Sequence, residues 1–311
     1  MKLKQLSPTD LRERLCDAGI WLRTGPFSLR ICSSIPSVAE GLTDLYGQFE
    51  VRDQRDSFAD FHVSVNSPSL LRRWIRPQVD FVFDGQLPFK PLPLDQAYPM
   101  LEWGLNWCVS MHAHQYLIIH AAVVEKNGRA AILPAPPGSG KSTLTAALIL
   151  SGWRLLSDEL TLIDRKTGLI HPLPRPVSLK NQSIPVIRAF SGDKAFINRP
   201  SHDTAKGTVA HMRPPKESVR RQHEPAQPAW VIFPEWVAGA ATELAPRSAA
   251  QTFMFLAQNA FNYSHLGADG FRVGTQLIGQ VDCYDFAYSQ LDEAVRAFDQ
   301  LADTPPQLRA V

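Results

Sequence analysis

The clearest chemical signal in this 311-residue chain is a glycine-rich stretch that also carries a lysine and hydroxyl side chains. Its members, in order, are Pro137, Gly138, Ser139, Gly140, Lys141, Ser142 and Thr143. The two glycines can take positive φ angles and let the backbone come close to a ligand, so that consecutive N–H groups converge on phosphate oxygens. Lys141 would add a positive charge at the β- and γ-phosphates, and Ser142 a hydroxyl ligand for Mg²⁺. The spacing predicts a P-loop that binds ATP with Mg²⁺.

One position departs from the strict P-loop pattern. That pattern has another glycine three residues before Gly138, where this chain has Ala135. Pro136 and Pro137 stiffen the entry to the loop instead. The alternative interpretation is an ordinary turn, rich in glycine and serine, before a surface helix. The order of strand, loop, Lys-Ser pair and helix favours the P-loop.

The elements on either side of the loop would position it. Residues 130–133 are apolar and predict a buried strand, and residues 142–151 predict a helix that Gly152 ends. Residues 153–156 predict the next strand. A right-handed crossover would make this strand parallel to the first, so its carboxyl end would open at the phosphate site.

Two acids follow that second strand. Asp158 and Glu159 cannot both point into the site from an extended chain, because successive side chains face opposite ways. We expect Asp158 to point inward, as a Mg²⁺ ligand or as the base that accepts a hydroxyl proton from a phosphoryl acceptor. Glu159 would bind the metal through water or support a neighbour. The alternative for Asp158 is a strand-end carboxylate that caps local amides.

The order of these motifs resembles the HPr kinase/phosphorylase superfamily. The likeness is carried by residues 120–125 (HAAVVE), an Asn127-Gly128 turn, the P-loop and residues 153–159 (WRLLSDE). That family has a histidine-glycine strand, a hairpin, a glycine-rich loop ending in Lys-Ser, and an aspartate pair in the same order. Within it the chain is most similar to kinases often encoded near exosortase or peptide-modification genes.

The resemblance implies a P-loop of the phosphoenolpyruvate-carboxykinase type, ATP with Mg²⁺, and phosphoryl transfer to a serine hydroxyl. The aspartate matching Asp158 would be the base, with His120 beside it to tune its charge, and Lys180 falls where the family has a basic residue. The chain departs from the family at Glu159, at Ala135 and at residues 178–181. These departures put the family's reverse phosphorylase reaction in doubt.

A further cation lies in a polar segment between residues 200 and 214. This segment has no helical or alternating apolar order and predicts a long loop, either a lid, a binding loop or a mobile surface segment. Lys206 would suit a cation that swings over the γ-phosphate. His202, Asp203 and His211 share the segment, but their spacing matches no common metal site.

Composition excludes several classes. With 44% hydrophobic and 20% charged residues and a net charge of +2, the chain predicts a globular protein without a field suited to nucleic acid. The four cysteines lie far apart, without a C-x-x-C pair, so neither a disulfide framework nor a zinc site is expected. The start has no apolar signal region and no long apolar run occurs, which predicts a cytoplasmic protein without membrane association. The family resemblance hints at a homo-oligomer, which no coiled-coil pattern supports or excludes.

The length predicts more than one core. Residues 1–92 predict an α+β module with an antiparallel sheet, and residues 93–311 a P-loop kinase domain. The expected fold class is α/β with a mixed sheet, of the HPr kinase and phosphoenolpyruvate-carboxykinase type.

Two functions fit these features. The first is a kinase that moves the γ-phosphoryl group of ATP to a serine- or threonine-type hydroxyl of a small protein, a peptide or a metabolite. Lys141 would act on the phosphates and Asp158 on the hydroxyl proton. The second is a nucleotide-dependent switch or ATPase in which water is the attacking group.

Overall fold

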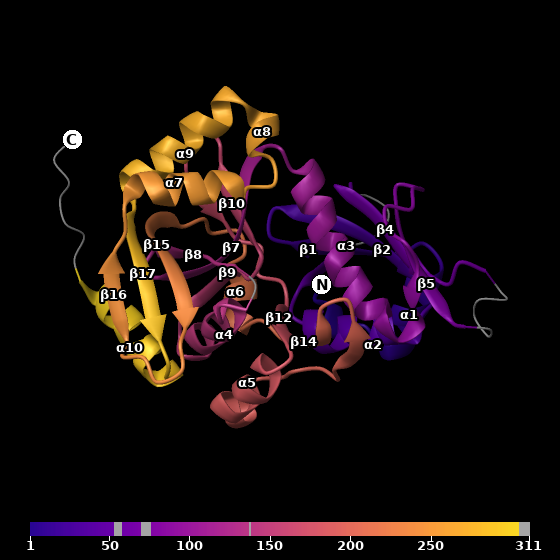
Figure 1. Ribbon diagram of the computed structural model, residues 1–311. Helices are drawn as coiled ribbons and strands as arrows, with labels where there is room; N and C mark the ends of the chain where they lie inside the picture. Colours follow the sequence, from indigo (N-terminus) through magenta and orange to yellow (C-terminus); the bar gives the residue numbers. More distant parts are fainter. Residues whose placement is uncertain (53–57, 70–75, 137, 305–311) are drawn as a thin grey trace. The chain divides into compact units, whose positions relative to one another are not determined.

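A computed structural model describes residues 1–52, 58–69, 76–136 and 138–304 (Figure 1). Its backbone contacts divide the chain into two compact units. The first unit comprises residues 1–114 and 171–224, and the second comprises residues 115–170 and 225–311. This division by packing differs from the expected boundary between residues 92 and 93, because the helix after that boundary packs with the N-terminal sheet.

The first unit is built on a sheet with the strand order β3-β1-β2-β4-β5-β6. Its elements are α1 (Pro8–Cys16), β1 (Ile20–Thr24), β2 (Phe27–Ser33), α2 (Pro36–Tyr46), β3 (Glu50–Arg52), β4 (Phe61–Asn66), β5 (Gln78–Phe83), β6 (Leu92–Pro93) and α3 (Ala97–His112), with short 3₁₀ turns at Leu3–Gln5 and Leu94–Gln96. Burial alternates along β2 as the two-residue period of a strand requires. Helix α3 packs against β4, β5 and α2.

The N-terminal sheet is not wholly antiparallel as expected. Strands β2 and β4 pair in parallel, with Leu29 opposite Phe61 and Ser33 opposite Val65. Helix α2 lies between these strands in the sequence and provides the crossover that a parallel pair needs. The pairs β1–β2, β1–β3, β4–β5 and β5–β6 are antiparallel.

The rest of the first unit corrects one expectation. It contains β12 (Val177–Lys180), α5 (Ser183–Ser191), β13 (Ser201–Thr204), β14 (Gly207–Met212) and α6 (Lys216–Arg220), and its strand order is β12-β14-β13. The prediction of a loop over residues 200–214 is wrong, because this segment forms a hairpin that pairs with β12. Strand β14 is buried from Val209 to Met212, while the outer strand β13 is polar.

The second unit is organised around a mixed sheet with the order β11-β10-β7-β8-β15-β17-β16, and β9 also pairs with β7. Its elements are β7 (Tyr116–Lys126), β8 (Arg129–Pro134), α4 (Lys141–Leu150), β9 (Arg154–Ser157), β10 (Leu160–Asp164), β11 (Ile170–His171), β15 (Gln227–Trp236), β16 (Glu243–Pro246), α7 (Ala249–Gln258), α8 (Tyr263–Leu266), α9 (Ala268–Gln280), β17 (Asp282–Tyr288) and α10 (Leu291–Asp303). Strands β8, β15 and β17 are mutually parallel neighbours, whereas β7 and β16 run the other way.

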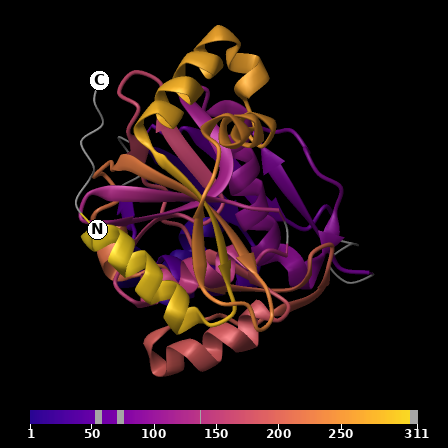
Figure 2. The same ribbon diagram turned by 60° about the vertical axis from the view of Figure 1, so that its left-hand side comes forward.

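Helices cover both faces of this sheet (Figure 2). On one face the ring of Phe286 packs against Phe298 of α10, with 5.2 Å between ring centroids. On the other face Phe233 packs against Phe255 of α7 at 5.0 Å. A buried apolar cluster that includes Ile132 of β8 fills the α7 and α9 side. The glycine-rich loop therefore follows β8, a central strand of a sheet that helices cover on both faces.

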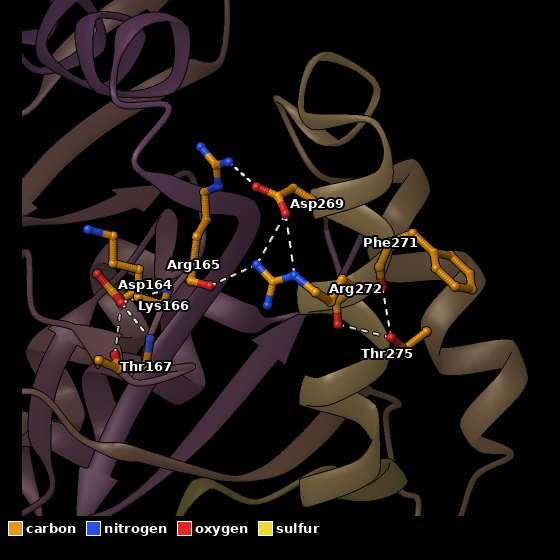
Figure 3. Close-up of polar contacts among 8 residues, drawn as sticks. All are labelled: Asp164, Arg165, Lys166, Thr167, Asp269, Phe271, Arg272 and Thr275. Carbon is orange, nitrogen blue, oxygen red and sulfur yellow. Dashed lines mark hydrogen bonds and ion pairs between the residues drawn. The ribbon is translucent and has the colours of Figure 1, made fainter.

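The turn after β10 is tied to α9 by charged side chains (Figure 3). Arg165 and Arg272 both pair with Asp269, and Arg272 also donates to the carbonyl oxygen of Arg165, at 3.1 Å. Within the turn, the Asp164 carboxylate accepts from the backbone amides of Lys166 and Thr167. These contacts fix the outer edge of the sheet to the helical layer.

The expected fold class is confirmed at the level of a mixed α/β protein with an N-terminal sheet module and a larger C-terminal sheet. Among the described residues, no helix is long and apolar enough to cross a bilayer.

Candidate functional site

The glycine-rich stretch forms a tight turn between β8 and α4. Gly138 has a φ angle of 89° and Gly140 one of 88°, both in the left-handed region that glycine tolerates. Gly140 immediately precedes the first residue of α4, so the helix N-terminus opens onto the turn. Helix N-termini and consecutive loop amides attract anions, because N–H groups and the helix dipole point the same way. This is the backbone geometry that a phosphate chain requires.

Two strands beside the loop hold it in place. The amide of Trp236, at the end of β15, donates to the carbonyl oxygen of Ser139 at 3.0 Å. The hydroxyl of Tyr288, at the end of β17, donates to the carbonyl oxygen of Gly140 at 3.3 Å. Burial raises the pKa of Tyr288 well above its ordinary value, so this hydroxyl keeps its proton and stays a donor. These two contacts attach Ser139 and Gly140 to the ends of β15 and β17.

The sheet brings Asp158 to the same edge as the loop. Strands β8 and β9 both run antiparallel to β7, with Pro134 opposite Ala121 and Ser157 opposite Val123, so their carboxyl ends meet at that edge. Asp158 follows β9 and is only 5% exposed. The hydroxyl of Ser142, in the first turn of α4, lies 3.4 Å from its Oδ2 atom.

Glu159 faces a different neighbour. Its Oε2 atom lies 3.5 Å from Nε2 of His120, and the backbone of His120 is paired with Leu160. The ring of His120 also lies beside Phe261, with 5.7 Å between centroids. Asp158 and Glu159, which form the bend between β9 and β10, thus contact different neighbours. The resemblance implied that His120 lies beside Asp158, the expected base. In the structure the His120 ring instead contacts Glu159, the residue after Asp158.

The oxygen atoms near the loop suit Mg²⁺ carried by a nucleotide. Mg²⁺ takes oxygen ligands, keeps several waters, and is usually held by one or two carboxylates together with substrate phosphates. Ser142 and Asp158 present a hydroxyl and a carboxylate at adjoining positions. The described residues contain no group of three His, Cys, Asp or Glu side chains that could hold a metal alone. The donor set fits a metal that arrives with phosphate ligands.

The remaining predicted residues lie elsewhere in the chain. Pro137 falls outside the described residues. Lys180 ends β12, and Lys206 lies in the turn between β13 and β14 with its Nζ atom 5.3 Å from the ring centroid of Trp103. Both lysines belong to the first unit, and the P-loop to the second. Their role at the phosphates stays a prediction.

Two further buried polar side chains, those of Arg175 and Asn262, have structural contacts. Arg175 is buried, 3.7 Å from a carboxylate oxygen of Glu102 and hydrogen-bonded to Asn106. The Asn262 side chain accepts from the amide of Ile118 at 3.0 Å and donates to the carbonyl oxygen of Tyr116 at 2.8 Å.

A cavity of about 510 Å³ borders the loop, and the sequence did not reveal it. It lies over the carboxyl-end halves of β15 and β17, and its wall includes Ser139, Phe233, Glu235, Glu243, Asp285 and Ala287. In parallel sheets, ligands bind beyond the carboxyl ends of the strands. That rule, applied to the apolar stretches that form β15 and β17, was the available signal. The cavity also involves the end of β15, which continues past Pro234 to Trp236.

The chain is similar to known proteins over part of its length. Residues 99–183 match a family model described as SynChlorMet cassette protein ScmC. The matched segment includes the glycine-rich loop and Asp158 but is less than half of the chain. A structure titled "Structure of the Hpr(Ser) kinase/phosphatase from Coxiella burnetii" is similar, at 12% sequence identity and a TM-score of 0.26. That match covers 59% of this chain and 96% of the other, and its score is too low to support a functional statement. No curated protein matches.

Proposed function

We propose that this protein is an ATP-dependent kinase that transfers the γ-phosphoryl group to a serine- or threonine-type hydroxyl of a peptide, a small protein or a metabolite. The single observation that carries the proposal is the 3.4 Å contact between Ser142 and the buried carboxylate of Asp158, directly beside a glycine loop at a helix N-terminus. A phosphate chain on the loop amides would have its terminal group next to this carboxylate.

Each side chain has a separate task in this proposal. Lys141 neutralises charge on the phosphates, and the amides from residue 138 onward orient them. Asp158 accepts the proton of the incoming hydroxyl as the oxygen attacks the γ-phosphorus and the bond to the ADP oxygen breaks. His120 positions Glu159 through their ion pair and acts one residue away from the base.

Mg²⁺ would be held by the Ser142 hydroxyl and the Asp158 carboxylate, and when bound it would neutralise charge on the phosphates. The burial of Asp158 limits water at this point, which favours a positioned hydroxyl as the attacking group over bulk water.

The test follows the label from γ-labelled ATP. Incubation with Mg²⁺, serine-containing peptides, free serine and a cell extract should leave label covalently attached to an acceptor. Asp158→Asn should lower the transfer rate by about 10²–10⁴-fold or more, because it removes the general base and one Mg²⁺ ligand. ATP should still bind, because the loop amides and Lys141 remain to hold its phosphates.

A matched control removes an exposed carboxylate from the same unit. Asp303→Asn, at the end of α10, should transfer label at the wild-type rate. Label that leaves only as free phosphate would favour a nucleotide-dependent switch or ATPase instead. An Asp158→Asn protein that transfers at the wild-type rate would remove the base assignment.

A further inference from the structure

The cavity beside the P-loop has a definite position relative to Asp158. Across the sheet, the strands at this edge follow the order β9, β7, β8, β15, β17, β16. Asp158 follows β9, whereas the cavity lies over β15, β17 and β16. The loop after β8 therefore stands between the proposed base and the cavity.

A nucleoside triphosphate on the loop has two ends, and the strand order predicts which strands each end lies near. If the terminal phosphorus faces Asp158, the opposite end of the molecule points toward β15 and β17. Gly138 and Ser139 line both the loop and the cavity. A ligand can therefore continue from the loop amides into the cavity without a break. From this geometry we infer that the cavity binds the nucleoside of ATP, an inference that rests on the proposed function.

The floor of the cavity has the chemistry of a nucleoside site. Ala287 on β17 lies between Glu235 on β15 and Glu243 on β16, because it is the register partner of both. With neighbouring strands about 4.8 Å apart, the two glutamates are about 10 Å apart and project from the same face. The small Ala287 side chain leaves open space between two carboxylates that accept hydrogen bonds.

These two carboxylates have no ion-pair partner among the described residues, unlike the third acid of the wall. Asp285 pairs with Arg247 at 2.5 Å, and the guanidinium of Arg247 lies 4.1 Å from the ring centroid of Phe233. Glu235 and Glu243 are exposed. Negative charge there opposes binding of a phosphate group but suits the ribose hydroxyls and the base amino group, which are hydrogen-bond donors.

The cavity also has the size and the apolar surface that suit a small molecule. The apolar side chains of the wall include Phe233 and Ala245. A volume of about 510 Å³ falls within the usual range of about 300–1,000 Å³ for small-molecule sites.

The test compares ATP with inorganic tripolyphosphate, which has the phosphates but no nucleoside. Isothermal titration calorimetry with Mg²⁺ should show about tenfold weaker ATP binding for Glu235→Gln, the usual effect of weakening a charge-assisted hydrogen bond. Ala287→Leu should weaken ATP binding at least as much because it fills the floor. Both variants should leave the affinity for tripolyphosphate within about twofold of wild type.

Control variants separate this inference from the proposed function. Glu13→Gln, on the exposed side of α1, and Ala268→Leu, at the exposed start of α9, should bind both ligands as wild type does. Lys141→Ala should weaken both ligands. If Lys141→Ala changes neither, the P-loop assignment fails.

If Lys141→Ala weakens both ligands while Glu235→Gln and Ala287→Leu bind ATP as tightly as wild type, the nucleoside inference alone fails. The inference also fails if these two variants raise only the KM of a cationic acceptor, because the cavity is then the acceptor site. Glu235→Gln keeps the test valid if Ala287→Leu does not fold.

Discussion

At the scale of single residues, the site depends on Gly140. Its φ angle of 88° lies in the left-handed region, and a Cβ atom built on it would lie 2.6 Å from the Tyr288 hydroxyl oxygen. This hydroxyl also holds the Gly140 carbonyl oxygen. Any side chain at position 140 would therefore strain the backbone and displace the contact that fixes the loop.

Gly140→Ala should lower the free energy of unfolding by about 1–3 kcal/mol and weaken ATP binding about tenfold or more. Urea unfolding and calorimetric titration measure the two effects. Gly128→Ala is the matched control, because Gly128 has a φ angle of 78° but nothing within 4 Å of its Cβ position. Equal ATP affinity in the two variants would show that the Tyr288 contact does not shape the site.

Residue-level prediction from the sequence identified the divergence of Asp158 and Glu159, whose side chains contact Ser142 and His120, but it assumed an extended chain where the structure has a bend. It could not find Trp236 or Tyr288, which hold the loop through the carbonyl oxygens of Ser139 and Gly140. Their position depends on the order of strands in the sheet, and local residue spacing does not reveal that order.

At the scale of elements, β9 carries Asp158 and is attached to β7 by a buried ion pair. Arg154 of β9 and Glu125 of β7 are register partners, and their side chains are 4% and 3% exposed. Glu125 also accepts from the Gly128 amide at 2.6 Å, which closes the turn into β8. One carboxylate thus links the strand of the proposed base to the strand of the loop.

Glu125→Ala should lower the free energy of unfolding by about 3–5 kcal/mol, because it leaves the Arg154 guanidinium buried without its carboxylate. Replacing both partners with leucine should recover most of that loss. Urea denaturation of the single and double variants measures the difference. A single variant as stable as wild type would mean that β9 does not depend on this pair.

The turn after β10 offers a pH-dependent test of a second attachment (Figure 3). Hydrogen bonds from Arg165 and then Arg272 lower the pKa of Asp269. A carboxyl group whose pKa is lowered by folding stabilises the protein above its unfolded pKa of about 3.9 and loses that contribution as the pH falls through its folded value. We expect Asp269→Asn to lower the Tm at pH 7 slightly, in a salt-dependent way.

The difference in Tm between wild type and Asp269→Asn should shrink as the pH falls below about 4, which differential scanning calorimetry measures. Asp282→Asn provides a control at an exposed aspartate of the same unit. A difference that stays constant from neutral to acid pH would show that ionisation of Asp269 contributes nothing to the attachment of α9.

Element prediction was sound where hydrophobic periodicity was strong and failed where it was weak. The strand-loop-helix order around the glycine-rich loop follows from apolar patterning. The hairpin of β13 and β14 was missed because its outer strand, Ser201–Thr204, is polar and is stabilised by pairing with β14. Pairing with β14, and not the local sequence pattern, therefore determines that residues 201–204 form a strand.

At the scale of the whole molecule, each compact unit is discontinuous in sequence. The chain leaves the second unit after Ile170 and returns to it at residue 225. Ile170 and Ala226 form an antiparallel bridge, with both N–O distances at 2.9 Å. The two ends of the inserted segment are therefore adjacent. The sequence predicted a contiguous domain over residues 93–311, since no local signal marks an insertion.

A protein of residues 115–311 in which a short glycine linker replaces residues 171–224 should fold cooperatively and bind ATP. The Ile170–Ala226 bridge lets the linker close without strain. Residues 93–311 alone should aggregate, because α3 loses its packing against β4 and β5. Circular dichroism, thermal melts and light scattering test both. A stable, monomeric 93–311 fragment would support the boundary near residue 92.

The most direct test of the central proposal is a crystal structure with Mg²⁺ and the β,γ-imido analogue of ATP. We predict that the triphosphate lies on the amides between Gly138 and Thr143, that its terminal phosphorus faces Asp158, and that the nucleoside lies over Ala287. A triphosphate bound away from this loop, or a terminal phosphate with the Asp158 carboxylate turned from it, would contradict the proposal.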